Sequence, residues 1–574
     1  MKQRYIKICA LLMSAAITAG SFSACGSKET ETMGAADKLT AAPSTTTAET
    51  SLSSQAEPGS AVTSPVPETT TTAADPAANE ISRDNKVYEG AEACMDTEAA
   101  APMMVYPDVN TEEYTVLGEN GMINTRNQPV STFSTDVDTA SYANTRRLLK
   151  ACSFVPESAV RAEEFINYFS YDYAQPEGDA PIALTTELSD CPWNDKAKLL
   201  MVGVQAKEQK LEKRLPMNIV LLIDVSGSMA SIDKLPLVKQ SVKMLTERLD
   251  ENDRISIVTY SGAEKVVLDS AKGTDRELVE RSLDELTAYG GTAGEAGINM
   301  AYALAEKNFI EGGNNRIVMA TDGDLNVGLS SVEELTELIE KKREGGVFLS
   351  VLGFGTGNLK DNRLEALADN GNGNYSYIDC IEEAEKVLGT ELASTLVTVA
   401  KDVKAQVEFD PAAVESYRLV GYENRMLSEE DFTDDTKDAG DMGAGHSSTA
   451  LYEVILTDGG MESDKSDALM TVKLRYKLPD SDTSSEIAST VRSGDYRSQP
   501  SPNLAFASAA AEFAMYLRGS EFSTLTPAQI KESVNSSGII TDKYREGFVE
   551  LLTLAESIYK YRPDDRPVDI IEIE

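Results

Sequence analysis

The sequence predicts an α/β protein built around a doubly wound, mostly parallel sheet, with a β-sandwich and further helices beside it. Between residues 217 and 396, apolar runs typical of buried strands alternate with amphipathic helical segments. Before and after this stretch lie segments with alternating apolar residues, which are typical of antiparallel strands. The chain has 574 residues, which is too long for a single hydrophobic core, so we expect several domains.

The composition excludes several classes of function. The chain carries 53 Lys and Arg residues against 94 Asp and Glu residues, a formal net charge of −41. Because nucleic-acid binding needs a positive surface, we expect no nucleic-acid partner. His446 is the single histidine, which leaves no basis for a His-based zinc site or a Ser-His-Asp triad. Any bound metal is therefore expected to be a hard cation held by oxygen ligands.

Residues 1–24 have the features of a secretory signal. A positively charged start is followed by an apolar run at 6–19 and by small residues before Cys25. This arrangement resembles the lipobox of bacterial lipoproteins, which implies cleavage before Cys25 and lipidation of its thiol. The expected location is the outer side of the bacterial cell membrane, with the lipid on Cys25 as anchor. An ordinary signal peptide with an incidental cysteine is the alternative.

Residues 25–101 are expected to be a disordered tether after the lipidated cysteine. Ala, Ser, Thr, Pro and Glu dominate this segment, and it has no apolar periodicity. Such a composition cannot bury enough apolar surface to offset the entropy lost on ordering. The tether would lift the folded domains from the membrane, or it is a dispensable low-complexity region.

The folded part is expected to have four regions. They are an N-terminal flanking region (102–216), the α/β domain (217–396), β-sandwich strands (397–490) and a C-terminal helical region (491–574). The predicted strands outside the α/β domain are 182–188, 199–205, 403–409, 416–421, 449–456 and 470–476. Since short strand pairs are not stable alone, we expect these strands to form one β-sandwich with the α/β domain inserted between them. Two separate small β units are the alternative.

Once the export signal is removed and Cys25 is lipidated, four cysteines remain, namely Cys94, Cys152, Cys191 and Cys380. Their wide, irregular spacing does not match a zinc site. Export permits up to two disulfides among them, and the pairing cannot be read from the sequence. Buried free thiols are the alternative.

Oxygen-bearing side chains follow predicted strands or precede helices at three places in the α/β domain. The segment 224–228 follows the first strand, 290–292 lies between two helical stretches, and 321–322 ends another strand. Because ligand sites in doubly wound sheets lie at the carboxyl ends of the strands, we expect all three to meet at one edge. The candidate ligands are two carboxylates and three hydroxyls, from Asp224, Ser226, Ser228, Thr292 and Asp322.

This set of oxygens suits Mg²⁺, with Mn²⁺ or Ca²⁺ as alternatives. Mg²⁺ prefers near-octahedral oxygen coordination and keeps some of its waters. Two carboxylates with neutral hydroxyls leave the ion under-neutralised, so an acidic group of a partner is attracted to an open position. The alternative interpretation is that these residues form turns and helix caps, which explains any one motif but not all three together.

The three motifs together resemble the metal-ion-dependent adhesion site of von Willebrand factor A domains. The D-x-S-x-S pattern lies at 224–228, the Gly-Gly-Thr loop at 290–292 and the T-D-G pattern at 321–323. The resemblance covers about 217–396. It implies that the two serines and Thr292 touch the metal, and that both aspartates contact it directly or through water.

A wider resemblance rests on Ser131–Tyr142, Glu163–Phe169 and Thr321–Gly328. These segments are similar to a bacterial family of exported von Willebrand A proteins with flanking N- and C-terminal regions. The resemblance would cover most of 102–574.

The expected function is metal-dependent binding of a protein or other acidic ligand at the cell surface. A scaffold or assembly role in the cell envelope, with a mainly structural metal, is the alternative, and the large flanking regions favour it. We expect no enzymatic activity. The site has no histidine and no distinct Asp or Glu base, and Ser226 and Ser228 lack an activating base.

Overall fold

The computed structural model describes most of the chain after residue 109. The described ranges are 110–208, 215–291, 294–324, 332–391, 397–437, 439–460 and 467–560. Several predicted features lie outside them, namely the export signal (1–24), the lipidated Cys25, the tether (25–101), Cys94 and Thr292. Within the described ranges, no helix has both the length and the apolar character needed to cross a bilayer.

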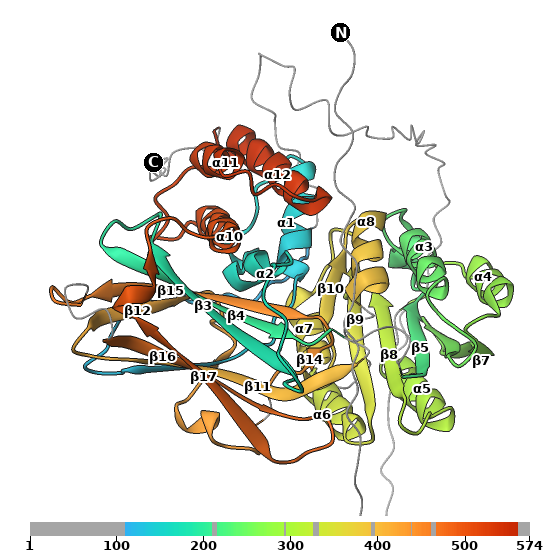
Figure 1. Ribbon diagram of the computed structural model, residues 1–574. Helices are drawn as coiled ribbons and strands as arrows, with labels where there is room; N and C mark the ends of the chain where they lie inside the picture. Colours follow the sequence, from blue (N-terminus) through green and yellow to red (C-terminus); the bar gives the residue numbers. More distant parts are fainter. Residues whose placement is uncertain are drawn as a thin grey trace, which may run out of the picture. The chain divides into compact units, whose positions relative to one another are not determined.

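The central sheet of the α/β domain has the strand order β10-β9-β8-β5-β6-β7 (Figure 1). Its strands are β5 (Met217–Asp224), β6 (Arg254–Tyr260), β7 (Lys265–Lys272), β8 (Asn314–Thr321), β9 (Val347–Phe354) and β10 (Tyr375–Ile378). Neighbouring strands are parallel except β6 and β7, which are antiparallel. All residues of β5 and β8 are buried, as their continuous apolar runs predicted. The predicted α/β fold with a mostly parallel sheet is confirmed.

Helices cover both faces of this sheet. They are α3 (Leu235–Thr246), α4 (Arg276–Asp284), α5 (Gly294–Lys307), α6 (Val332–Arg343), α7 (Asp361–Asn370) and α8 (Ile381–Ala384). Successive side chains of β5 point to opposite faces, so Leu221 packs in the cluster that includes α3, whereas Leu222 packs in the cluster that includes α5. This alternation places one apolar core on each side of the sheet.

Two further sheets take strands from both sides of the α/β domain. One has the order β1-β12-β15-β4-β3-β18, and the other has the order β13-β2-β11-β16-β17 with β14 paired to β11. The first contains β1 (Ile123–Asn124), β3 (Ile182–Asp190), β4 (Ala197–Ala206), β12 (Val414–Val420), β15 (Ser447–Leu456) and β18 (Tyr496–Arg497). The second contains β2 (Val130–Ser134), β11 (Thr398–Phe409), β13 (Met426–Leu427), β14 (Met442–Gly443), β16 (Ala468–Lys477) and β17 (Ser484–Arg492).

Long-range pairing holds these two sheets together. β4 precedes the α/β domain and pairs antiparallel with β15, which follows it; β2 and β11 pair in the same way. One buried cluster contains side chains of β4 and β15 from the first sheet and of β11 and β16 from the second. The two sheets therefore share an apolar core, and neither is complete without strands from both sides of the α/β domain.

Some elements differ from the prediction. Residues 130–134, which are not among the predicted strands, form β2, and the strands extend past residue 490 through β17 and β18. β17 is an edge strand with mostly half-buried or exposed residues, so its apolar alternation is weak. The helix α2 spans only Ala162–Asn167, because Val160 and Arg161 have extended backbones after a short 3-10 helix.

The predicted C-terminal helical region is present as three helices packed on two from the N-terminal region. α10 (Pro502–Arg518), α11 (Pro527–Ser536) and α12 (Lys543–Tyr559) share one core with α1 (Ala140–Lys150) and α2 (Figure 1). Side-chain caps explain where these helices begin, since Ser501 accepts a hydrogen bond from the backbone of α10 and Asp542 does so for α12. The two ends of the folded chain therefore form one helical layer.

Of the four cysteines after Cys25, the described residues leave at most one disulfide. Cys191 and Cys380 are free thiols, and burial raises the pKa of each. Cys152 is disulfide-bonded. The chain therefore uses both alternatives that the cysteine count left open.

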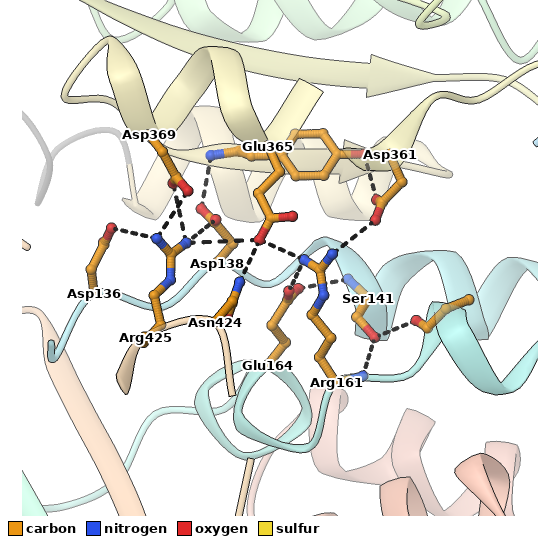
Figure 2. Close-up of polar contacts among 12 residues, drawn as sticks. Asp136, Asp138, Ser141, Arg161, Glu164, Asp361, Glu365, Asp369, Asn424 and Arg425 are labelled. Carbon is orange, nitrogen blue, oxygen red and sulfur yellow. Dashed lines mark hydrogen bonds and ion pairs between the residues drawn. The ribbon is translucent and has the colours of Figure 1, made fainter. Parts of the chain in front are cut away.

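Ion pairs join α7 of the α/β domain to the N-terminal region (Figure 2). Arg161, just before α2, contacts Glu164 at 3.0 Å, Glu365 at 2.7 Å and Asp361 at 3.5 Å. All four side chains are at least nine-tenths buried. A buried guanidinium with three carboxylates is stable only as a unit, because each charge relies on the others for the solvation it has lost.

A second arginine joins the same helix to the loop after β12 (Figure 2). Arg425 donates to Asp369 of α7 at 3.0 Å and to Asp138 at 3.0 Å. Its neighbour Asn424 donates to Glu365 at 2.8 Å. α7 is thus held from two sides, by the N-terminal region and by the strands that follow the α/β domain.

We predict that Arg161→Met lowers the free energy of unfolding by about 3–5 kcal/mol, because buried carboxylates are left without their cation. The loss should shrink as the pH falls, since protonation neutralises those carboxylates. Urea unfolding at several pH values measures both effects. Arg475→Met is the control, because Arg475 pairs with Asp435 at the surface, at 2.9 Å, and should cost about 1 kcal/mol or less. Equal losses in the two variants would contradict this account of the network.

Candidate metal centre

The candidate centre lies where two neighbouring parallel strands end. Asp224 is the last residue of β5, and Asp322 directly follows β8, which pairs with β5. Both aspartates are fully buried, with 0% exposure. They are close enough that the charge of Asp322 raises the pKa of Asp224. The structure thus places both carboxylates at one sheet edge, where the predicted topology put them.

Both oxygens of Asp224 accept hydrogen bonds. The backbone N–H of Ser226 donates to Oδ1 at 2.8 Å, and the hydroxyl of Thr321 donates to Oδ2 at 3.1 Å. Burial raises the pKa of the Asp224 carboxyl to about 6, and the charge of Asp322 adds to this shift, whereas these hydrogen bonds oppose it. The carboxylate is oriented, but its charge is only partly compensated by the protein.

The two serines of the D-x-S-x-S segment lie together beside the aspartates. The Oγ atoms of Ser226 and Ser228 are 2.9 Å apart, and Ser228 is hydrogen-bonded to Asp322. Ser226 is buried, whereas Ser228 is exposed, so the serine pair connects the buried carboxylates to the surface. Four of the five predicted ligands are therefore in one place.

The glycine loop contacts the serine loop. The backbone N–H of Gly227 donates to the carbonyl of Gly290 at 3.0 Å. Gly290 has a φ of +85°, and a Cβ there would lie 2.6 Å from the Oγ of Ser261. Only glycine fits this backbone and this approach without a shift. Thr292, the fifth predicted ligand, is two residues further along and lies outside the described part of the chain.

Residues after Asp322 take part only locally. The backbone N–H of Asp324 donates to Asp322 Oδ1 at 3.2 Å, which is a short-range turn contact. Asn326, also near the motif in sequence, lies beyond the described residues.

Lys234 is a member of the site that sequence reasoning missed. Its ammonium donates to Asp322 Oδ2 at 3.0 Å and to Asn358 Oδ1 at 2.8 Å, and the residue is only 5% exposed. Burial alone would raise the pKa of Asp322, but the hydrogen bond from Asn358 and the charge of Lys234 outweigh it and hold the pKa below its usual value. Asp322 is therefore a stable carboxylate with a cation already beside it.

The space for Lys234 depends on a glycine far away in the sequence. Gly355, just after β9, has a φ of +78°, and a Cβ there would lie 2.2 Å from two carbons of the Lys234 stem. A lysine shortly before a helix is usually exposed. Nothing local in the sequence distinguishes Lys234 from such a residue, so only the fold reveals its place.

The donor set fits a hard divalent cation. Asp224, Asp322 and two serine hydroxyls offer only oxygen, which Mg²⁺ prefers. Among the described residues, no group of three or more His, Cys, Asp or Glu side chains could hold a metal, so this site depends on its hydroxyls. Two carboxylates and one ammonium sum to a formal charge of −2 + 1 = −1, which is less negative than the sequence motif suggests.

Comparison with known families agrees with the fold. The model of the von Willebrand factor type A domain matches residues 218–388, and a model described as von Willebrand factor matches 108–201. The model described as "Uncharacterized protein YfbK, C-terminal" matches 394–558. The three models together account for most of the described chain.

A relative that matches over most of both chains shows the family. The uncharacterized protein YfbK of Escherichia coli (strain K12) is 41% identical over 471 residues, which cover 78% of this chain and 82% of YfbK. This chain belongs to the YfbK family. Its α/β domain is a von Willebrand factor type A domain, as the resemblance implied.

More distant relatives match smaller parts of this YfbK-family chain. The uncharacterized protein sll0103 of Synechocystis sp. is 29% identical over 206 residues, 36% of this chain and 48% of that protein. The inter-alpha-trypsin inhibitor heavy chain H3 of Homo sapiens is 32% identical over 162 residues, 27% of this chain and 18% of that protein. Among solved structures, "von Willebrand factor type A from Catenulispora acidiphila" is 17% identical and covers 67% of this chain and 91% of its own, with a TM-score of 0.39.

Proposed function

We propose that this protein binds a partner protein, or another acidic ligand, through a divalent metal ion held by Asp224, Ser226, Ser228, Thr292 and Asp322. The observation that carries the proposal is the meeting of two fully buried carboxylates with two serine hydroxyls at one sheet edge. Von Willebrand factor A domains typically mediate protein interactions, which favours binding over catalysis.

The ion in this proposal is Mg²⁺, with Mn²⁺ or Ca²⁺ as alternatives. When bound, it supplies a positive, open coordination position to a carboxylate of the partner. Asp224 and Asp322 provide the negative charge, the serines provide neutral oxygens, and Lys234 removes part of the negative charge. Because the protein under-neutralises the ion, an acidic partner group gains more here than it would at an all-carboxylate site.

Catalysis is not part of the proposal. Among the described residues of the centre there is no histidine. The Asp224 carboxylate accepts from a backbone N–H and from the Thr321 hydroxyl, and in this proposal it serves as a metal ligand.

We also propose that a lipid on Cys25 holds the protein on the outer side of the bacterial cell membrane, with 25–101 as tether. The support is the sequence pattern before Cys25.

We also infer that the two flanking sheets form one β-sandwich with the α/β domain inserted in it, from the pairing of β4 with β15 and of β2 with β11.

A scaffold or assembly role in the cell envelope, with a mainly structural metal, is the second candidate. It is favoured by the way in which Arg161 and Arg425 hold α7 to both flanking regions. A domain whose only task was adhesion would not need such extensive burial against its neighbours.

We predict that Mg²⁺ or Mn²⁺ raises the thermal midpoint of the 574-residue chain relative to EDTA. Binding to the native state alone adds about 2.7 kcal/mol of stability at a hundredfold excess over Kd. Asp322→Ala should abolish the rise, whereas Asp435→Ala, a change at an exposed surface pair, should keep it. The absence of any rise in the unaltered protein would count against the metal site.

Lys234→Met should tighten the binding of Mn²⁺ by about tenfold, or roughly 1.4 kcal/mol, because it removes a positive charge beside Asp322. Isothermal titration calorimetry gives the dissociation constants. Lys243→Met, in the helix α3 that directly follows Lys234, is the control, because Lys243 pairs with the exposed Asp284. An unchanged or weaker affinity in Lys234→Met would show that Lys234 does not oppose the metal.

Cys25→Ser should move the protein from the membrane fraction to the soluble fraction of bacterial cells that express it, since no lipid can then be attached. Immunoblots of the two fractions measure the change. Cys94→Ser is the control and should leave the protein with the membrane. Retention of Cys25→Ser in the membrane fraction would refute the lipid anchor.

A further inference from the structure

Two large apolar side chains are unusually exposed on the loops around the candidate metal centre. Ile232 is 84% exposed and Tyr289 is 70% exposed. Among the described residues, Val116 is the one other large apolar side chain with more than half of its surface exposed, at 84%, and it lies outside these loops. The remaining exposed large apolar side chains have values between 39% and 46%.

Both side chains lie close in sequence to candidate ligands. Ile232 is four residues after Ser228, and Tyr289 directly precedes Gly290, whose carbonyl accepts from the serine loop. They therefore lie on the two loops of the centre, which contact each other through Gly227 and Gly290. We call Ile232 and Tyr289 the apolar rim.

Hydrogen bonds fix the backbone at Tyr289. Its N–H donates to the carbonyl of Val225 at 2.8 Å, and its own carbonyl accepts from the hydroxyl of Ser261 at 2.6 Å. The ring is thus presented to solvent by an ordered loop.

The loop that carries Ile232 is anchored on both sides of it. Met229 is fully buried, and Lys234 is held against Asp322. The backbone N–H of Lys234 also donates to the carbonyl of Ser231 at 3.1 Å. Because this loop is already ordered, Ile232 can contact a partner with little loss of conformational entropy.

The charges around the apolar rim are negative. Asp233, Glu264 and Asp324 lie on the loops at this edge of the sheet, and none of the three is buried. In the described parts of the same loops (225–234, 261–264, 287–291, 322–324 and 355–358), Lys234 is the single cation, and it is buried against Asp322. A partner with several acidic groups would be repelled here except at the metal itself.

We propose that this face recognises a protein segment with a single carboxylate flanked by apolar side chains. The carboxylate would meet the metal, and its apolar neighbours would cover Ile232 and Tyr289. The proposal rests on the metal-dependent binding proposed above and adds the class of partner. Aromatic and aliphatic side chains that pack around a central polar contact are typical of the residues that dominate binding energy.

The test is a phage-displayed library of random peptides panned on the 574-residue chain, in Mg²⁺ and in parallel in EDTA. In Mg²⁺ the enriched peptides should carry one Asp or Glu next to Leu, Ile, Phe or Trp. Synthetic versions of the enriched peptides should bind the Tyr289→Ser and Ile232→Ser variants at least about tenfold more weakly than they bind the unaltered protein. Val116→Ser is the matched control, because Val116 is as exposed as Ile232, and it should bind the peptides normally.

The outcomes separate this proposal from the one it rests on. Mg²⁺-dependent peptides with runs of acidic residues, or with no apolar neighbours, would overturn the apolar rim and leave metal-dependent binding intact. Equal affinity for Tyr289→Ser, Ile232→Ser and Val116→Ser would do the same. No Mg²⁺-dependent enrichment at all would overturn both proposals. Unchanged thermal midpoints of the three variants show that any loss of binding is not a loss of fold.

Discussion

The burial of two carboxylates at one sheet edge is the constraint that shapes the candidate centre, and the contact between Lys234 and Asp322 offsets part of its cost. Two carboxylates are fully buried at one sheet edge, which is costly unless each charge is compensated. The hydrogen bond from Asn358 and the charge of Lys234, whose ammonium lies 3.0 Å from Asp322, keep the pKa of Asp322 low, whereas burial raises the pKa of Asp224 to about 6. The ammonium of Lys234 thus compensates one of the two buried carboxylates, that of Asp322. The other carboxylate, Asp224, is buried and oriented, and serine hydroxyls lie beside it. A hard cation would stabilise its charge.

The same contact connects the centre to the flanking regions. Asn358, the second partner of Lys234, lies on the loop between β9 and α7. The N-terminal segment is hydrogen-bonded along this loop, since the N–H of Thr111 donates to the carbonyl of Gly357 and the N–H of Glu113 donates to that of Leu359, both at 2.9 Å. The loop then leads into α7, which carries the partners of the two buried arginines. The loops of the centre are therefore braced by the chain on both sides of the von Willebrand factor A domain.

Sequence patterns predicted what depends on local periodicity. The apolar runs of β5 and β8 located the central strands, and the aspartates at their ends followed from the topology of doubly wound sheets. β2 and β17 were not predicted, because their apolar alternation is weak: β2 is short, and β17 is mostly half-buried or exposed. The place of Lys234 could not be predicted, because it depends on Asn358 and Gly355, which come more than a hundred residues later. The buried arginines depend in the same way on pairings that only the tertiary fold creates.

The central claim is that Asp224, the two serines and Asp322 hold a metal ion, and anomalous diffraction tests it most directly. Crystals grown with Mn²⁺ should be measured at the manganese absorption edge, beside crystals of Asp322→Ala grown in the same way. We predict one strong anomalous peak among the Asp224, Ser226, Ser228 and Asp322 oxygens, and no peak there in the variant. An ordered centre without a peak in saturating Mn²⁺ would contradict the account.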